Sequence, residues 1–141
     1  MKNVVKCILI LCLSLCFFGC KNDVFDASIT EVFYTDDNPN NTSLSSLQRV
    51  DTILNGVGYY LVVDFHQPNM DVAKLILQYG PDSREISYDI TERKFVNQYT
   101  WWSGMKWTVT ENEYDAELKF YLEDSDGRRS SSYSLYVDFV K

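Results

Sequence analysis

Apolar and polar side chains alternate along most of this chain, and a period of two restricts such segments to β-strands. The pattern is clearest at the end of the chain, where two alternating runs flank a turn at Asp124 to Gly127. Asp126-Gly127 is a strong turn signal between two strands. We therefore predict a hairpin with one buried face, made of Tyr114, Ala116, Leu118, Phe120, Leu122, Tyr133, Leu135, Val137 and Phe139.

Six further segments are predicted strands. They cover residues 28–35, 57–66, 72–79, 85–90, 94–102 and 105–110, with the last two separated near Gly104. Residues 44–54 fit either a short amphipathic helical turn or a strand. We expect about seven of these eight candidate segments to form strands, and such a number without a convincing helix favours an antiparallel β-sandwich, with a small barrel as the alternative.

The order Tyr, x, Ala, x, Leu, x, Phe, followed by an Asp-Gly turn and a final alternating strand, resembles the last two strands of immunoglobulin-like sandwiches such as fibronectin type III domains. The resemblance implies an all-β immunoglobulin-like fold, which we assign to residues 27–141. It also implies that Tyr114 forms a tyrosine corner, in which the hydroxyl bonds back to the backbone before the strand.

The start of the chain reads as a secretory signal. Lys2 and Lys6 precede an apolar run over residues 7–18, which ends at Gly19 and Cys20 and is too short to span a bilayer. An ordinary cleaved signal peptide has the same outline. Residues 17–20 (FFGC) resemble the lipobox of bacterial lipoproteins, although that family usually has Leu and a small residue where two Phe residues stand here.

This resemblance implies cleavage between Gly19 and Cys20, diacylglyceryl transfer to the Cys20 sulfur, and acylation of the freed amine by a chain such as palmitate. Residues 1–19 would then be the signal peptide, and residues 20–26 the lipidated cysteine and a short tether. Two or three acyl chains hold a protein on a membrane stably. Lys21 is not the Asp that retains enterobacterial lipoproteins in the inner membrane, so an outer membrane is preferred where the host has one.

Cys20 is also the last cysteine, and 121 residues follow it. Disulfides, thiolate nucleophiles and Cys-bound zinc are thereby excluded from the mature domain. Removal of residues 1–19 leaves 11 Lys and Arg against 20 Asp and Glu, a net charge of −9. Nucleic acid is not an expected partner, because its binding needs basic patches.

The sequence predicts no catalytic residue, no metal and no cofactor besides the covalent lipid on Cys20. His66 is the only histidine and ends a predicted strand without a nucleophile motif beside it. Asp124-Ser125-Asp126-Gly127 is similar to the middle of a calcium loop, but both ends of that motif fail, so a tight turn is the better interpretation. We therefore expect no enzymatic activity.

Aromatic residues gather at Tyr99–Trp107, which holds all three tryptophans. Trp101 and Trp102 are adjacent in a predicted strand, so their side chains point to opposite faces. An exposed indole near Tyr99 would stack on a sugar or anchor a protein. Alternatively, one indole fills the core and the other covers a sheet edge or lies under residues 44–54.

Two functions fit these observations. The first is a membrane-anchored envelope or cell-surface lipoprotein whose domain is a non-catalytic interaction module for an envelope protein. The alternative is a carbohydrate-binding module that contacts its glycan through Tyr99, Trp101, Trp102 and Trp107.

Overall fold

Nine strands in two sheets make up the part of the chain that the computed structural model describes, residues 25–67, 72–90, 94–97 and 100–141. The strands are β1 (Ser28–Thr35), β2 (Thr52–Leu54), β3 (Gly58–His66), β4 (Val72–Tyr79), β5 (Arg84–Asp89), β6 (Lys94–Asn97), β7 (Thr100–Lys106), β8 (Glu113–Asp124) and β9 (Tyr133–Val140). One 3₁₀ turn, η1 (Leu44–Ser46), lies between β1 and β2. Over these ranges no helix has the length and apolar character needed to cross a membrane.

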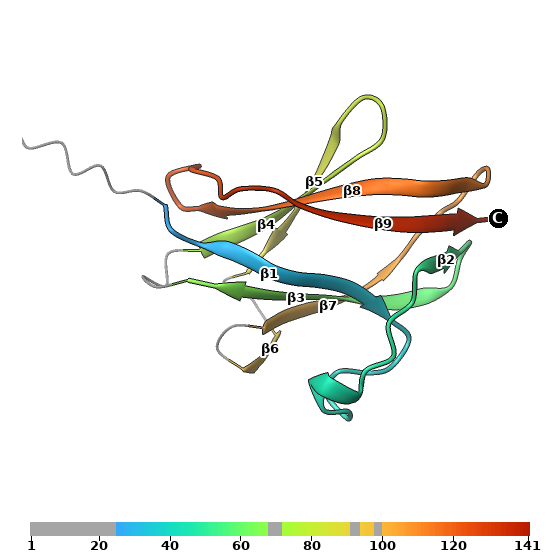
Figure 1. Cartoon of the computed structure of the whole chain (residues 1–141), viewed down its shortest axis with the longest axis horizontal. Helices are drawn as coiled ribbons and strands as arrows, with labels where there is room; N and C mark the ends of the chain where they lie inside the picture. The colour runs from blue at the N-terminus through green and yellow to red at the C-terminus, as the bar shows by residue number, and fades with distance from the viewer. Residues whose placement is uncertain (1–24, 68–71, 91–93, 98–99) are drawn as a thin grey trace, which may run out of the picture.

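The two sheets pack face to face as a sandwich (Figure 1). Sheet A has the order β1-β3-β7-β6, and sheet B has the order β2-β9-β8-β4-β5. Every pairing is antiparallel except that of β2 with β9, which is parallel. The all-β sandwich prediction is confirmed, but the count of about seven strands was too low. The described β2 and β6 have three and four residues, which is too short to show a period of two.

One local prediction needs correction, and one that left two alternatives open is resolved. Gly104 does not separate two strands, because it lies inside β7 opposite Tyr60 of β3. Residues 44–54 contain both of the alternatives that their pattern allowed. The 3₁₀ turn η1 occupies the beginning of this segment, and β2 occupies its end.

The main core lies between the two sheets. It is made of the apolar side chains that point inward at alternate positions along the strands. The predicted buried face of the β8–β9 hairpin is confirmed at Ala116, Leu118, Phe120, Leu122, Val137 and Phe139, while Tyr133 and Leu135 are half-buried. Sheet A contributes Tyr34, Leu61, Val63, Phe65 and Trp101 from the facing side. Each fully buried apolar side chain contributes about 1.5–3 kcal/mol, so this interface is the main stabilising element.

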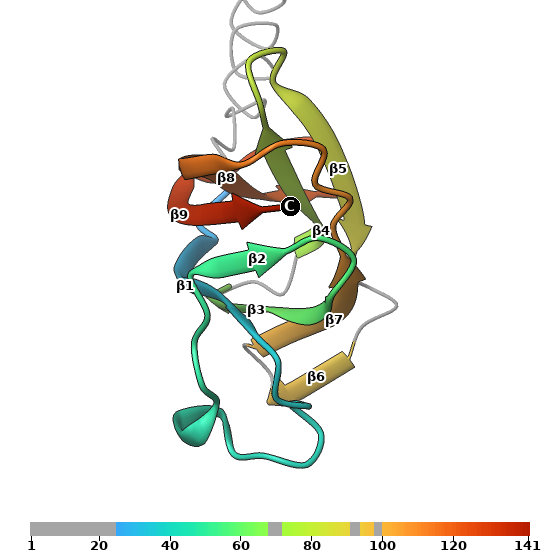
Figure 2. The ribbon, with the colours of Figure 1, turned by 90° about the vertical axis from the view of Figure 1, so that its right-hand side faces the viewer.

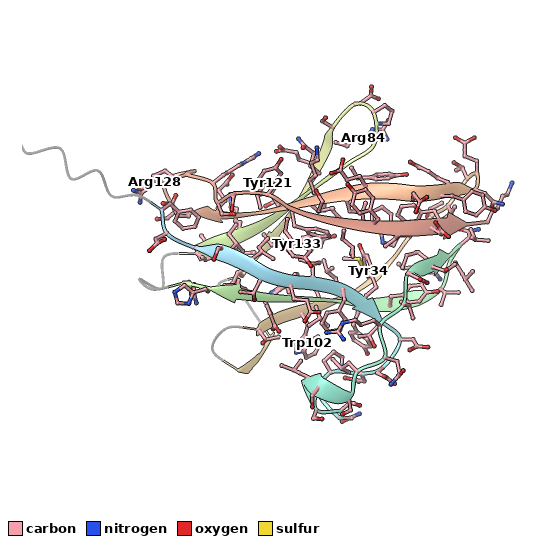
Figure 3. The ribbon with its side chains drawn as sticks, in the orientation of Figure 1. Tyr34, Arg84, Trp102, Tyr121, Arg128 and Tyr133 are labelled. Atoms are coloured by element: carbon pink, nitrogen blue, oxygen red, sulfur yellow. The ribbon has the colours of Figure 1, made fainter. Side chains whose placement is uncertain are left out.

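A second apolar cluster lies on the outer face of sheet A, and we call it the outer cluster. Its members are Phe33, Leu47, Val62 and Trp102, with Leu44 and Tyr60 at its border. The loop of residues 36–51 covers this face, and Figure 3 shows Trp102 pointing toward that loop. Arg49 fastens the loop, because its guanidinium pairs with Glu31 at 2.5 Å and lies 4.8 Å from the Phe33 ring centroid.

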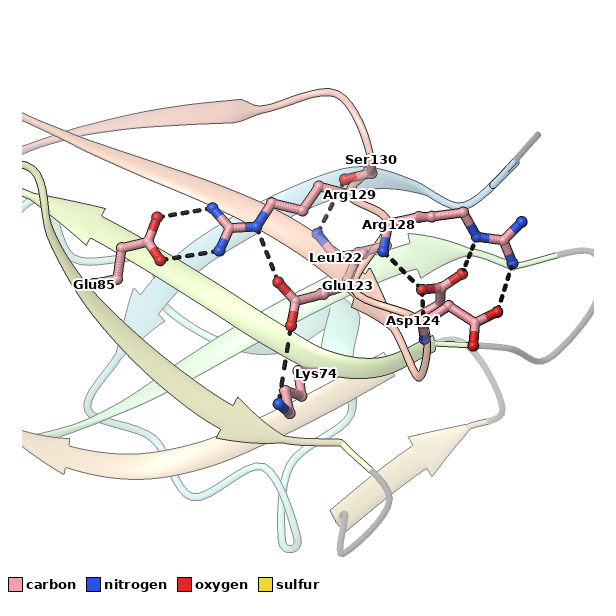
Figure 4. A network of polar contacts seen from close by, with 9 residues as sticks. Lys74, Glu85, Leu122, Glu123, Asp124, Arg128, Arg129 and Ser130 are labelled. Carbon is pink, nitrogen blue, oxygen red and sulfur yellow. Dashed lines mark hydrogen bonds and ion pairs between the residues drawn. The ribbon is translucent and has the colours of Figure 1, made fainter. Parts of the chain in front are cut away.

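The β8–β9 turn is organised around the buried carboxylate of Asp124 (Figure 4). Its oxygens accept hydrogen bonds from the Asp126 and Arg128 backbone N–H groups at 3.0 and 2.8 Å, and from Arg128 Nε at 2.6 Å. Burial acts to raise the pKa of Asp124, but the bonds from Arg128 and Asp126 outweigh it and hold the pKa below its ordinary value. Asp124-Gly127 is therefore a tight turn, as its sequence indicated.

Outside this turn, a line of ion pairs runs across the outer face of sheet B (Figure 4). Arg129 bonds both carboxylate oxygens of Glu85, at 2.7 and 2.9 Å, and also Glu123 at 2.9 Å. Lys74 lies 3.9 Å from Glu123. The network links β4, β5 and β8, so it holds the edge strand β5 to the sheet.

Acid should weaken the fold through Asp124. Because its folded pKa is depressed, the stabilisation is complete above the unfolded pKa of about 3.9 and is lost as pH falls through the folded value. We expect Asp124→Asn to lower the urea midpoint at pH 7 and to differ little from the parent chain at pH 2. The control is Asp126→Asn, whose side chain is 76% exposed. An unchanged midpoint for Asp124→Asn at pH 7 would show that the carboxylate does not organise the turn.

Candidate functional site

The two adjacent tryptophans point to opposite faces, as predicted, yet both are buried. Trp101 lies in the main core, with its ring 5.6 Å from that of Tyr88, and Trp102 lies in the outer cluster with its ring edge-on to Tyr60 at 5.7 Å. The prediction that they contact a ligand is wrong, because the loop of residues 36–51 covers the second face. The alternative, one indole in the core and one beneath the 44–54 segment, is confirmed. Tyr99 lies outside the described residues.

Trp107 has a different environment. It follows the end of β7, is half-buried, and packs against Phe139 of β9 with ring centroids 4.9 Å apart. Tyr79, at the end of β4, closes the group at 5.5 Å from Trp107 and 5.4 Å from Phe139. We call these three residues the aromatic trio. It gathers rings from three segments at one end of the sandwich.

An open groove lies over the aromatic trio, and we call it the end groove. Its volume is about 610 Å³, and its walls are the β4–β5 hairpin and the connection from β7 to β8. Figure 2 views this end of the molecule, with β5 at the outer edge and the β7–β8 connection between β5 and the C-terminus. The groove is large enough for a few residues of peptide or a small sugar.

Carboxylates surround the groove. The Tyr79 hydroxyl donates a 2.7 Å hydrogen bond to Glu113 Oε2. Burial, this bond and the negative charges of Glu113 and Glu111 together raise the pKa of Tyr79 to about 12. Both carboxylates therefore lie near one phenol.

The other charged groups at the groove already have partners. Asp82 lies 4.0 Å from Arg84, and Glu85 is held by Arg129. Among the described residues, neither Glu111 nor Glu113 forms an ion pair. The end groove thus combines an aromatic floor with two uncompensated negative charges.

Trp107 is held by ring packing rather than by a side-chain hydrogen bond. Within the described part of the chain, its Nε1 and the Tyr34 hydroxyl are buried without a hydrogen-bond partner. Burial raises the pKa of Tyr34, and the nearby indole N–H of Trp107 opposes that rise. Each buried polar group without a hydrogen-bond partner lowers the free energy of unfolding by about 1–3 kcal/mol. The core next to the groove accommodates two such groups.

The tyrosine-corner prediction for Tyr114 is wrong. Its side chain is 64% exposed, and its hydroxyl accepts a 3.4 Å hydrogen bond from Asn112 Nδ2 rather than bonding to the backbone. A register shift between Glu113 and Ala116, with Asp115 at φ 53°, turns Tyr114 away from the inward side of β8. Periodicity alone cannot show such a bulge.

The remaining predicted site residues lie away from the end groove or outside the described residues. His66 ends β3 at the opposite end of the strand from Gly58, which pairs with Lys106 beside Trp107. The described residues contain no group of three His, Cys, Asp or Glu placed to hold a metal ion. Cys20 and the Gly19–Cys20 bond fall outside the described residues.

Sequence reasoning found Trp107 but missed Tyr79, Phe139, Glu111 and Glu113. These residues lie on separate strands and on the connection between two of them, and no short motif joins them. A signal was present in the Glu111-x-Glu113 pair just after an aromatic segment. This pair indicates a site only because the fold places it next to Tyr79, which is 34 positions from Glu113 in the sequence.

Comparisons with known proteins establish the fold only. No protein-family model matches the chain, and no curated protein matches it. Among solved structures, it is similar to a Niemann-Pick type C2 protein from the Japanese carpenter ant, with a TM-score of 0.52 and 6% identity over 80% of this chain and 92% of that one. This similarity confirms the immunoglobulin-like β-sandwich.

The exposure of Tyr114 predicts a small effect of its removal. Tyr114→Ala should change the free energy of unfolding by less than about 0.5 kcal/mol, because exposed side chains contribute little. Phe120→Ala on the same strand is the control, and it should cost about 3–5 kcal/mol because Phe120 is fully buried. Urea unfolding measures both. A loss above 1 kcal/mol for Tyr114→Ala would restore the tyrosine corner.

Glu113→Gln should lower the pKa of Tyr79 toward its ordinary value of about 10, because it removes one negative charge and the acceptor carboxylate. In the parent chain the raised pKa makes the fold lose stability as pH rises from about 10 to about 12, because the phenol of the unfolded chain deprotonates first; the variant should lose less stability over this range. NMR titration of ring-labelled tyrosine measures the shift, with Tyr79→Phe assigning the signal. Glu117→Gln, on the outer face of sheet B, should leave it unchanged.

Proposed function

We propose that this protein is a lipid-anchored, non-catalytic binding protein of the bacterial envelope, and that its ligand site is the end groove. The observation that carries the proposal is the position of the groove at the end of the sandwich farthest from the tether. The lipidation of Cys20 is inferred from the N-terminal signal sequence. The outer-membrane location is inferred from Lys21, which follows that cysteine.

The tether is short. Ala27 is buried in the main core and Phe25 packs against it, so the folded domain begins within five residues of Cys20. Five residues reach at most about 18 Å. An acylated Cys20 would therefore hold the beginning of β1 close to the bilayer.

The groove lies at the other end. In Figure 1 the chain enters β1 on the left, while the C-terminus that follows β9 lies on the right. The nine residues of β3 run from Gly58, near the groove, to His66, opposite Ser28 at the tether end. That strand is about 30 Å long. Anchoring at Cys20 would point the end groove away from the membrane.

The form of the groove favours binding over catalysis. It is open, whereas catalytic sites exclude water as they close on the substrate. Its polar side chains are carboxylates, a phenol, the hydroxyls of Thr108 and Thr110, and an arginine that pairs with Asp82. These groups suit recognition of a ligand displayed outside the membrane.

Carbohydrate binding is the second candidate function. Trp107 favours it, because a half-buried indole in a groove with carboxylate acceptors is suited to stack on a sugar ring. Of the three predicted aromatic residues that the structure describes, Trp107 alone supports this function, since Trp101 and Trp102 are buried. Trp107→Ala would then abolish glycan binding without unfolding the domain.

Cys20→Ser should abolish acyl labelling in cells and move the protein from the membrane to the soluble fraction. The matched control is Cys16→Ser, which changes a thiol in the discarded signal segment and should leave both properties intact. Fractionation after metabolic labelling with an alkyne fatty acid measures both. Membrane retention of unlabelled Cys20→Ser would contradict the anchor.

The same preparation tests the orientation. The mature domain has no cysteine after Cys20, so single cysteines can be placed at the exposed positions Thr110, by the groove, and Ser125, in the β8–β9 turn. After labelling with a donor dye in vesicles that carry an acceptor lipid, energy transfer should be strong from position 125 and weak from position 110. Equal transfer would contradict a groove that faces away from the membrane.

A further inference from the structure

We propose that the end groove and the adjacent edge of β5 bind an extended segment of a partner protein. The segment pairs with β5 as an added strand and places a Lys or Arg side chain against Glu111 and Glu113. The inference rests on the proposed function in that it uses the same groove, and it adds the chemistry of the ligand.

The edge of β5 is available for pairing. β5 is the last strand of sheet B, and in the described part of the chain its sole strand partner is β4. The Ile90 N–H donates to the Ala73 carbonyl at 2.9 Å, and hydrogen-bonded pairs alternate along an antiparallel ladder. The N–H groups of Glu85 and Ser87 therefore point to the open edge. Open edges of this kind accept an added strand.

The groove lies beside this edge. Ile86 pairs with Leu77, so its side chain points to the inner side of sheet B, and it lines the groove while remaining 43% exposed. Side chains directly opposite each other on paired strands point to the same face. A partner residue opposite Ile86 would therefore direct its side chain into the end groove. Backbone pairing and side-chain capture would use one continuous surface.

The charges of the groove select the side chain. Glu111 and Glu113 have no ion pair in the described structure, and both lie close enough to Tyr79 to raise its pKa. A Lys or Arg side chain would compensate these carboxylates and lie near the rings of Tyr79 and Trp107, which attract cations through their faces. An acidic side chain would be repelled, and an apolar one would desolvate the carboxylates without pairing them.

The arginine that already lines the groove does not fill this role. Arg84 has its ion pair with Asp82, at 4.0 Å, and its side chain is 83% exposed. Figure 3 shows Arg84 on the β4–β5 hairpin. The position between Glu111 and Glu113 therefore lacks a basic partner from the described residues.

The test uses the full lipidated chain in detergent micelles and a fluorescein-labelled peptide of seven alternating Thr and Val residues with a central Lys. Fluorescence anisotropy should show saturable binding. A matched peptide with norleucine in place of Lys should bind at least about tenfold more weakly, since a charge-assisted contact contributes about 1.5 kcal/mol or more. Equal affinities of the two peptides would overturn the cation site.

Variants of the protein separate the two parts of the inference. The double variant Glu111→Gln with Glu113→Gln should weaken the Lys peptide about tenfold, while Glu117→Gln, outside the groove, should not. Ser87→Pro removes an outward N–H and should abolish peptide binding, whereas Ser87→Ala keeps that N–H and should retain it. Urea midpoints confirm that each variant is folded. An unchanged affinity for Ser87→Pro would overturn strand addition.

Chitohexaose, a neutral glycan, provides the competing outcome. Binding of this glycan that is lost in Trp107→Ala, with no binding of the Lys peptide, would overturn the inference and leave the groove as a carbohydrate site. Failure of both probes would overturn the inference as well. Neither result affects the Cys20→Ser and energy-transfer experiments. Those experiments test the lipid anchor and the orientation of the groove, so a failure of the inference can be told apart from a failure of the proposed function.

Discussion

Apolar contact between the two sheets is the interaction on which the rest of this structure depends. No cysteine follows Cys20, so no disulfide supplements the packing of residues such as Leu61, Leu118 and Phe120. The same packing fixes the two ends of the domain. Phe25 and Ala27 join the core at the end where β1 begins, while Phe139 joins it at the end where it supports Trp107. The direction from the proposed anchor to the groove would therefore be set by the core itself and would not depend on a flexible loop.

Coverage by a loop decides which tryptophan is accessible to a ligand. Trp101 and Trp102 are equivalent in sequence terms, and alternation alone exposes one of them. Residues 36–51 remove that exposure by placing Leu44 and Leu47 over Trp102. Trp107 lies beyond the end of β7, where neither sheet nor this loop covers it fully. The candidate site thus arises at an end of the sandwich, where strands stop and backbone turns bring distant side chains together.

Strands with a full period of two were predictable, and β1 and β4 have the residue bounds that their sequences indicate. Prediction failed where geometry departs from regular alternation. The bulge at Asp115 turned Tyr114 outward, and Gly104 continued a strand that its residue type argued against. The site was harder still, because Tyr79, Glu113 and Phe139 meet only through tertiary packing. Residue types at the groove were visible in the sequence, but their proximity was not.

The proposed lipid anchor and the open groove are physically suited to each other. An open groove with two carboxylates would give modest affinity, because exposed charges remain partly solvated and are screened by salt. Anchoring at Cys20 would confine the protein to a surface, and many copies facing the same way would raise the effective concentration met by a partner displayed nearby. Weak, reversible pairing at β5 would then suffice for contact at the envelope. The acidity of the chain would add selectivity, because its net charge of −7, or −9 after removal of residues 1–19, repels acidic segments before they reach the groove.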